Sequence, residues 1–87
     1  MAQHKRAEVS RRVARIHGHV HAIKEMLDEG RPYSEIVQQV SAVRSALDSV
    51  VNVIISDLVE DCVARTRSKE PLESTLQELQ AVVAASK

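Results

Sequence analysis

The stretch IVQQVSAVRSALDSVVNVII, residues 36–55, carries apolar side chains at alternating intervals of four and three residues. The members of this series are Ile36, Val40, Val43, Leu47, Val50 and Ile54. A mean interval near 3.5 residues is typical of an α-helix that packs one apolar face against another helix. The series continues in steps of four through Leu58 and Cys62, so we expect a helix over residues 33–66.

The same spacing occurs upstream, at Val9, Val13, Ile16, Val20, Ile23 and Leu27. It predicts a helix over residues 5–29 that ends at Gly30, because glycine readily adopts the positive φ of a helix C-terminus. Pro32 suits the first turn of the next helix, and Pro71 opens a third helix over residues 71–85. The sequence therefore predicts an all-α fold in which the first two of three helices form an antiparallel hairpin.

The middle helix carries a second apolar stripe, formed by Val37, Val51, Ile55 and Val59. The two shorter helices of one chain cannot cover both stripes of a helix that is about 50 Å long. We therefore expect a single domain over residues 1–87 whose hairpin dimerises into a four-helix bundle.

The composition excludes several classes of protein. There is one aromatic residue, Tyr33, and one cysteine, Cys62, so no intrachain disulfide can form. Neither an apolar run of membrane-spanning length nor an apolar leader is visible, and we expect a cytoplasmic protein without a membrane partner. Paired carboxylates, a nucleophile–base spacing and a phosphate-binding loop are also missing, so we expect no enzyme.

Charge is balanced overall but unevenly placed. The chain has a formal net charge of zero, with 12 basic and 12 acidic residues. Residues 1–15 hold five basic residues against Glu8, a local charge of 5 − 1 = +4. Such an end can bind nucleic acid, although a solvated helix face would carry the same residues. Charge alone makes Arg11 and Arg44 candidates, and the lack of interleaved aromatic residues favours duplex DNA over single strands.

Three blocks of sequence resemble the CsoR/RcnR family of bacterial repressors. They are RVARIHGHVHAIKEMLDEG from residue 12, IVQQVSAVRSAL from residue 36 and DLVEDCV from residue 57. The resemblance implies three helices per protomer, assembly into dimers or tetramers, and DNA binding through basic residues of the first helix. Lys5, Arg12 and Arg15 fall at such basic positions, and Glu78 at one that couples sensing to DNA release.

The family's sensing site lies between protomers, and this sequence departs from it. Tyr33 and Leu58 replace a cysteine and a histidine there, and Cys62 keeps the family residue. Copper(I) prefers two or three soft donors, so we expect an inducer other than copper(I). Three interpretations stay open: Cys62 responds alone, the site has become packed interface, or a metal site has moved to the histidines.

The histidines offer a weak metal signal. His17 and His21 are four residues apart and could share a helix face, and His4 is a further candidate ligand. His19 points about 200° from His17, so the trio cannot bind one metal from one straight helix. The alternative interpretation is that these histidines occupy exposed helix positions and bind no metal. We therefore leave two possibilities for a cofactor, none or a transition-metal ion. The rival function is a helical interaction module that has lost DNA binding and sensing.

Overall fold

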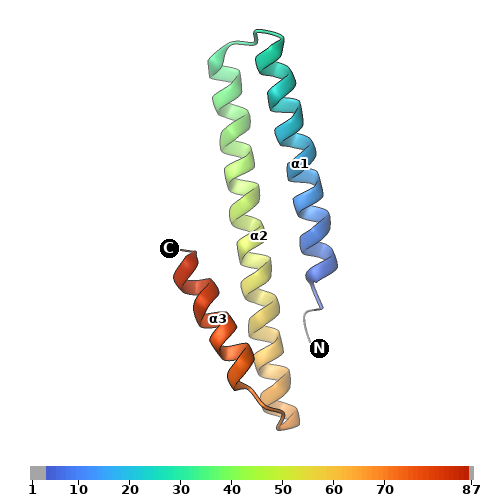
Figure 1. Ribbon diagram of the computed structural model, residues 1–87, viewed down its shortest axis with the longest axis vertical. Coiled ribbons are helices and arrows are strands. Elements are labelled where there is room, and N and C mark those ends of the chain that lie inside the picture. Colours follow the sequence, from blue (N-terminus) through green and yellow to red (C-terminus); the bar gives the residue numbers. More distant parts are fainter. Residues whose placement is uncertain (1–3, 87) are drawn as a thin grey trace.

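The computed structural model describes residues 4–86, and within that range it contains three α-helices and no β-strand. The bounds are Arg6–Asp28 for α1, Tyr33–Ser68 for α2 and Glu73–Ala85 for α3. Each observed end lies within two residues of the predicted one. The all-α architecture with an antiparallel α1–α2 hairpin is confirmed (Figure 1).

The α1–α2 turn is a helix C-terminal motif followed directly by a new helix. Gly30 has a φ of 75°, and the N–H of Arg31 donates to the carbonyl of Met26 at 3.0 Å, which closes the last turn of α1. Pro32 lies just before α2 rather than inside its first turn, because its ψ of 141° is extended. Its carbonyl accepts the N–H groups of Glu35 and Ile36, so Pro32 still begins the helical hydrogen bonding.

The α2–α3 turn differs slightly from expectation. α2 runs two residues further than predicted, to Ser68, and Lys69 caps its end with a left-handed φ of 59°. The N–H of Glu70 then donates to the carbonyl of Arg65 at 2.9 Å. α3 begins at Glu73, two residues after Pro71, so Pro71 lies in the turn and not in the helix.

The protomer is an elongated, flat arrangement of helices. α1 and α3 pack against different sides of α2, and within the described residues they make no direct helix–helix contact with each other (Figure 1). The molecule measures 58 × 24 × 13 Å, with a radius of gyration of 17.2 Å. A globular domain of this length would have a radius of gyration of about 12 Å. Within residues 4–86, no helix combines the length and apolarity needed to cross a membrane.

Only alternate members of the heptad series are buried inside the protomer. Ile23, Ile36 and Val43 form the α1–α2 core, and Ile16 and Met26 pack against it. No apolar side chain in this core falls below 7% exposure. The hairpin therefore has a thin core that one chain cannot thicken.

The intervening heptad positions remain exposed. They are Val13, Val20, Leu27, Val40 and Leu47, with 42–49% of their surface accessible. Contiguous apolar surface of this kind is uncommon on a soluble monomer and marks an interaction face. The hairpin thus leaves a set of large apolar side chains accessible on its surface.

Candidate DNA interface and sensor position

Three of the predicted DNA-contacting arginines gather on one side of α1. Arg11, Arg12 and Arg15 line one hollow together with Glu8. Arg12 and Arg15 also border a second hollow between α1 and α2. Arg11 and Arg15 are exposed, whereas Arg12 is half-buried and donates from Nε and Nη2 to Glu8, both at 3.0 Å. The helix therefore displays a compact guanidinium cluster with one internal carboxylate.

Lys5 is placed differently from this cluster. Its ammonium lies 2.9 Å from Glu60 and donates to the Ser56 hydroxyl at 3.1 Å, so the side chain is held by α2. The hydrogen bond between the Lys5 and Glu60 side chains is the main reason that the pKa of Lys5 is raised and the pKa of Glu60 is lowered. A contact between Lys5 and a phosphate would require this ion pair to open.

Arg44 also lies outside the α1 arginine cluster. It is exposed on α2 and lines neither of the hollows that the α1 arginines border. The structure therefore groups Arg11, Arg12 and Arg15 but does not join Lys5 or Arg44 to them.

The three sensor-position residues do not meet within one protomer. Tyr33 begins α2 and is 79% exposed, whereas Leu58 is only 4% exposed and Cys62 is half-buried. Tyr33 and Cys62 are 62 − 33 = 29 residues apart on one continuous helix, a separation of about 44 Å. Any site that combines them must draw on two protomers.

These side chains do not fit a copper(I) site. One thiol, one phenol and one isobutyl group supply a single soft donor, whereas copper(I) prefers two or three. Among residues 4–86, no three His, Cys, Asp or Glu side chains lie close enough together to hold a metal ion. The side chains at the sensor position therefore cannot form the ligand set that copper(I) prefers.

The histidines are spread over different surroundings. His4 and His17 are exposed, and the side chain of His21 is 72% exposed with its Nε2 3.9 Å from Glu25. His19 instead turns toward α2, where its Nε2 lies 2.7 Å from Oε1 of Gln39. The described part of the chain therefore brings no histidine pair and third ligand together.

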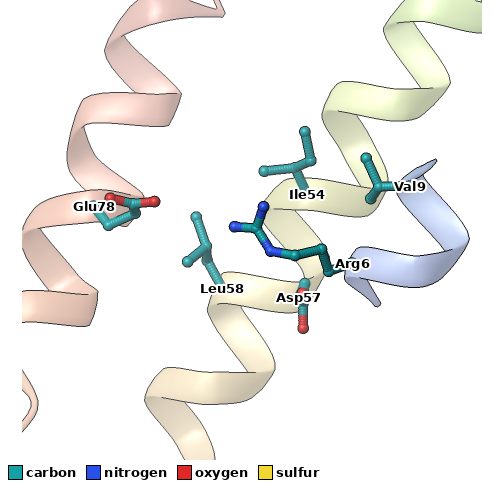
Figure 2. Close-up of a pocket in the computed structure, with 6 residues that line it drawn as sticks. All are labelled: Arg6, Val9, Ile54, Asp57, Leu58 and Glu78. Carbon is teal, nitrogen blue, oxygen red and sulfur yellow. The ribbon is translucent and has the colours of Figure 1, made fainter. Parts of the chain in front are cut away.

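Glu78 lies beside Leu58 at a cleft of about 220 Å³ between the three helices. Figure 2 shows Arg6 of α1 and Glu78 of α3 extending toward opposite sides of the Leu58 side chain. The remaining wall residues are Val9, Ile54 and Asp57. The predicted coupling residue and one predicted sensor-position residue thus share a single cavity.

Sequence reasoning missed two buried carboxylates of α2. Asp57 is 5% exposed, and its Oδ2 accepts the backbone N–H of Lys5 at 3.2 Å. Asp61 is 3% exposed and accepts the Thr75 hydroxyl of α3 at 2.9 Å and the Arg65 Nε at 3.2 Å. The two aspartates lie in an acidic segment of α2, and their sequence alone does not indicate that they are buried. Their long-range partners, Lys5 at the start of α1 and Thr75 of α3, are distant in the sequence.

The surroundings of Asp61 lower the pKa of its carboxyl group. Burial on its own would raise the pKa of the carboxyl, but the hydrogen bonds from Thr75 and Arg65 outweigh burial and lower it. Arg65 also donates from Nη1 to the carbonyl of Pro71 at 3.1 Å. Asp61 and Arg65 together fasten α3 and the turn before it to the end of α2.

The structure defines an all-α protein of three helices, with an arginine cluster on α1 and exposed apolar residues along the hairpin. Comparison with known proteins identifies the family to which it belongs. The family model for metal-sensitive transcriptional repressors matches residues 5–85, and the chain belongs to this family. The family comprises repressors and not enzymes, which confirms both the predicted resemblance and the non-enzymatic expectation.

Two relatives illustrate the similarity. The chain is 31% identical over 72 residues to the copper-sensing transcriptional repressor CsoR of Bacillus subtilis (strain 168), covering 83% of this chain and 71% of that protein. The solved structure of the nickel-responsive transcriptional regulator InrS matches with a TM-score of 0.80 at 33% identity, over 100% of this chain and 98% of that one. The three-helix fold is therefore that of a known regulator.

Proposed function

We propose that this chain represses transcription as a cytoplasmic homo-oligomer that binds duplex operator DNA through α1. The observation that carries the proposal is the cluster of Arg11, Arg12 and Arg15 on one side of α1. Guanidinium groups neutralise phosphates and displace counterions, which provides affinity without a recognition helix. Lys5 and Arg44 extend this interface in the proposal, Lys5 after its ion pair with Glu60 opens.

Oligomerisation is the second part of the proposal. The exposed face of Val13, Val20, Val40 and Leu47 supplies apolar surface for a second hairpin, and pairing two hairpins would produce a four-helix core. Because both copies would present an arginine cluster, a dimer or tetramer could hold two stretches of one duplex. The thin core of the single protomer supports this assembly.

The proposed response is independent of copper(I). The relatives named above are described as copper-sensing and nickel-responsive, whereas Leu58 and Tyr33 replace potential ligands in this chain. The burial of Leu58 within the protomer and the partial burial of Cys62 are more consistent with side-chain packing than with a metal centre. We propose a repressor whose inducer acts without the family's copper ligand set.

The rival proposal is an interaction module that does not bind DNA. It is supported by the ion pairs of Lys5 and Arg12, whose charges are already neutralised by carboxylates of the same chain. Fluorescence anisotropy with a duplex from upstream of the chain's own gene separates the two. The repressor should bind this duplex more tightly than a scrambled duplex, with an affinity that falls steeply as salt rises. Equal, weak binding to both duplexes would contradict the repressor and favour the module.

A further inference from the structure

The groove between α1 and α2 contains a hollow beside Ser49, which we call the Ser49 hollow. Its walls are Arg12, Arg15 and Ile16 of α1 and Ala46 and Ser49 of α2. Its volume of about 230 Å³ is many times the space that one bound water requires, so a phosphate group fits. Because Ile16 and Ala46 are apolar, the side-chain groups that can bond an occupant are two guanidinium groups and one hydroxyl.

A neighbouring contact shows how the two helices face each other on this side of the hairpin. Lys5 donates from Nζ to the Ser56 hydroxyl at 3.1 Å, across the antiparallel pair. Arg12 is 12 − 5 = 7 residues after Lys5, and Ser49 is 56 − 49 = 7 residues before Ser56, a step of about two helical turns on each helix. Arg12 therefore lies across from Ser49 as Lys5 lies across from Ser56. Lys5 bonds its serine directly, whereas the Ser49 hollow opens between Arg12 and Ser49.

The polar groups around the Ser49 hollow retain unused hydrogen-bond donors. A guanidinium has five N–H donors, and Arg12 gives one from Nε and one from Nη2 to Glu8. Within residues 4–86, neither the Arg15 guanidinium nor the Ser49 hydroxyl has a hydrogen-bond or ion-pair partner. Two guanidinium charges against the one carboxylate of Glu8 leave a net positive charge. The surroundings therefore favour an anion with several acceptor oxygens.

We propose that the Ser49 hollow holds one phosphate group of the DNA backbone, with Arg12 and Arg15 donating from α1 and the Ser49 hydroxyl donating from α2. The assignment to DNA rests on the proposed repressor function. Arginine and serine side chains are both common donors to DNA phosphates, and such contacts fix the register of a protein on the duplex. The interface thereby extends from the arginine cluster of α1 onto α2, and Ser49 becomes a phosphate contact.

Fluorescence anisotropy with the duplex from upstream of the chain's own gene tests the Ser49 contact. Ser49→Ala removes the donor and should weaken duplex binding about fivefold. Its log–log salt slope should keep the wild-type value, because an uncharged hydroxyl displaces no counterion. Ser49→Asp sets a negative charge against the phosphate and should weaken binding at least about tenfold. Wild-type affinity in both variants would overturn the proposal.

Ser45 provides the matched control. It is an exposed serine about one turn earlier on α2, and it lines neither hollow that the α1 arginines border. Ser45→Ala should keep the wild-type affinity, and Ser45→Asp should weaken duplex binding less than Ser49→Asp, because solvent and salt screen its charge from the phosphates. Both serines are exposed, so all four variants should retain the helical circular dichroism. Equal losses for the two aspartate variants would contradict the contact, since net charge alone would then explain them.

A titration without DNA tests the Ser49 hollow separately from the repressor function. Inorganic phosphate is added to the full ¹⁵N-labelled chain, and sodium chloride at the same ionic strength is the reference. Phosphate should shift the amide resonances of Ala46 and Ser49 and the Nε resonance of Arg15 with saturation, and Ser49→Asp should abolish these shifts. If phosphate causes no saturable shift beyond that of chloride, the site is overturned.

The two measurements together distinguish a phosphate of DNA from a free phosphate ion. Saturable phosphate shifts combined with weaker duplex binding by the Ser49 variants support the contact with DNA. Saturable shifts combined with wild-type duplex binding by those variants would assign the hollow to a free anion and overturn that contact. A wild type that binds no duplex would contradict the repressor function and the DNA contact with it, whereas the titration would still show whether the hollow takes an anion.

Discussion

The Oδ2 atom of Asp57 accepts the backbone N–H of Lys5 at 3.2 Å, and so joins two residues that are 52 positions apart. The carboxylate lies at the N-terminus of α1, where unpaired N–H groups and the helix dipole both favour a negative charge. The Lys5 side chain is held by the neighbouring Ser56 and Glu60 of the same helix. α2 therefore fixes the start of the helix that carries the arginine cluster.

Asp57→Ala should loosen the start of α1. Loss of the cap to the Lys5 N–H is expected to lower the free energy of unfolding by about 1 kcal/mol. Urea denaturation at one fixed protein concentration measures this change. Asp48→Ala, which removes an exposed carboxylate from the same helix, is the matched control and should change stability by less than about 0.5 kcal/mol. Equal stability of the two variants would contradict the capping role.

Acid should weaken the docking of α3. Because the pKa of Asp61 is lower in the folded chain than in the unfolded one, its contribution is complete above the ordinary aspartate pKa of about 3.9. That contribution is lost as the pH falls from there through the lowered folded pKa. Melting temperatures between pH 6 and pH 2.5 should therefore separate wild type from Asp61→Asn at the higher pH and converge at the lower one. A constant difference across the range would contradict this linkage.

The fold could be predicted further than the site. Apolar spacing, Gly30 and the two prolines locate the helices, because helix periodicity and helix termination depend on residues close together in the chain. The division of the heptad series into buried Val43 and exposed Leu47 could not be predicted, since both fit one apolar stripe. It depends on how α1 crosses α2.

The long-range polar contacts could not be predicted from the sequence either, because they also depend on how the helices pack. From the sequence, Lys5 is expected to be a free DNA-binding cation, but in the structure it pairs with Glu60. Asp61 is likewise expected to be solvated, but in the structure it accepts a hydrogen bond from Thr75 of α3. The local arginine cluster, in contrast, follows from helical spacing alone, because Arg11 and Arg15 are one turn apart.

Leu47→Glu should disrupt the proposed pairing of hairpins. Leu47 is 47% exposed in the protomer, so a charge there costs little in the monomer but would be buried in a four-helix core. Sedimentation equilibrium should show a dimer or larger assembly for wild type and a monomer for Leu47→Glu. Val83→Glu on α3, at a similar exposure of 42%, should keep the dimer. A monomeric wild type would refute the bundle.

Restoring ligands should restore metal binding. In competition with a chromogenic chelator, wild type should withdraw no copper(I) beyond what Cys62 binds weakly as a single thiolate. Tyr33→Cys combined with Leu58→His supplies two thiolates and an imidazole across the proposed interface, and should bind copper(I) at least about a hundredfold more tightly, or about 2.8 kcal/mol. Tyr33→Ser with Leu58→His keeps only one thiolate and is the control. Tight binding of copper(I) by wild type would contradict the proposed copper(I)-independent response.

The most direct test of DNA binding through α1 is the salt dependence of operator affinity for wild type, Arg11→Ala/Arg15→Ala and Arg67→Ala, measured by fluorescence anisotropy. Arg67 is an exposed arginine in the last turn of α2, outside the α1 cluster. We expect the double variant to bind more weakly and its log–log salt slope to shrink by about one for each phosphate contact removed. Arg67→Ala should retain the wild-type affinity and slope. Identical slopes for all three proteins would contradict the account, because the α1 arginines would then contact no phosphate.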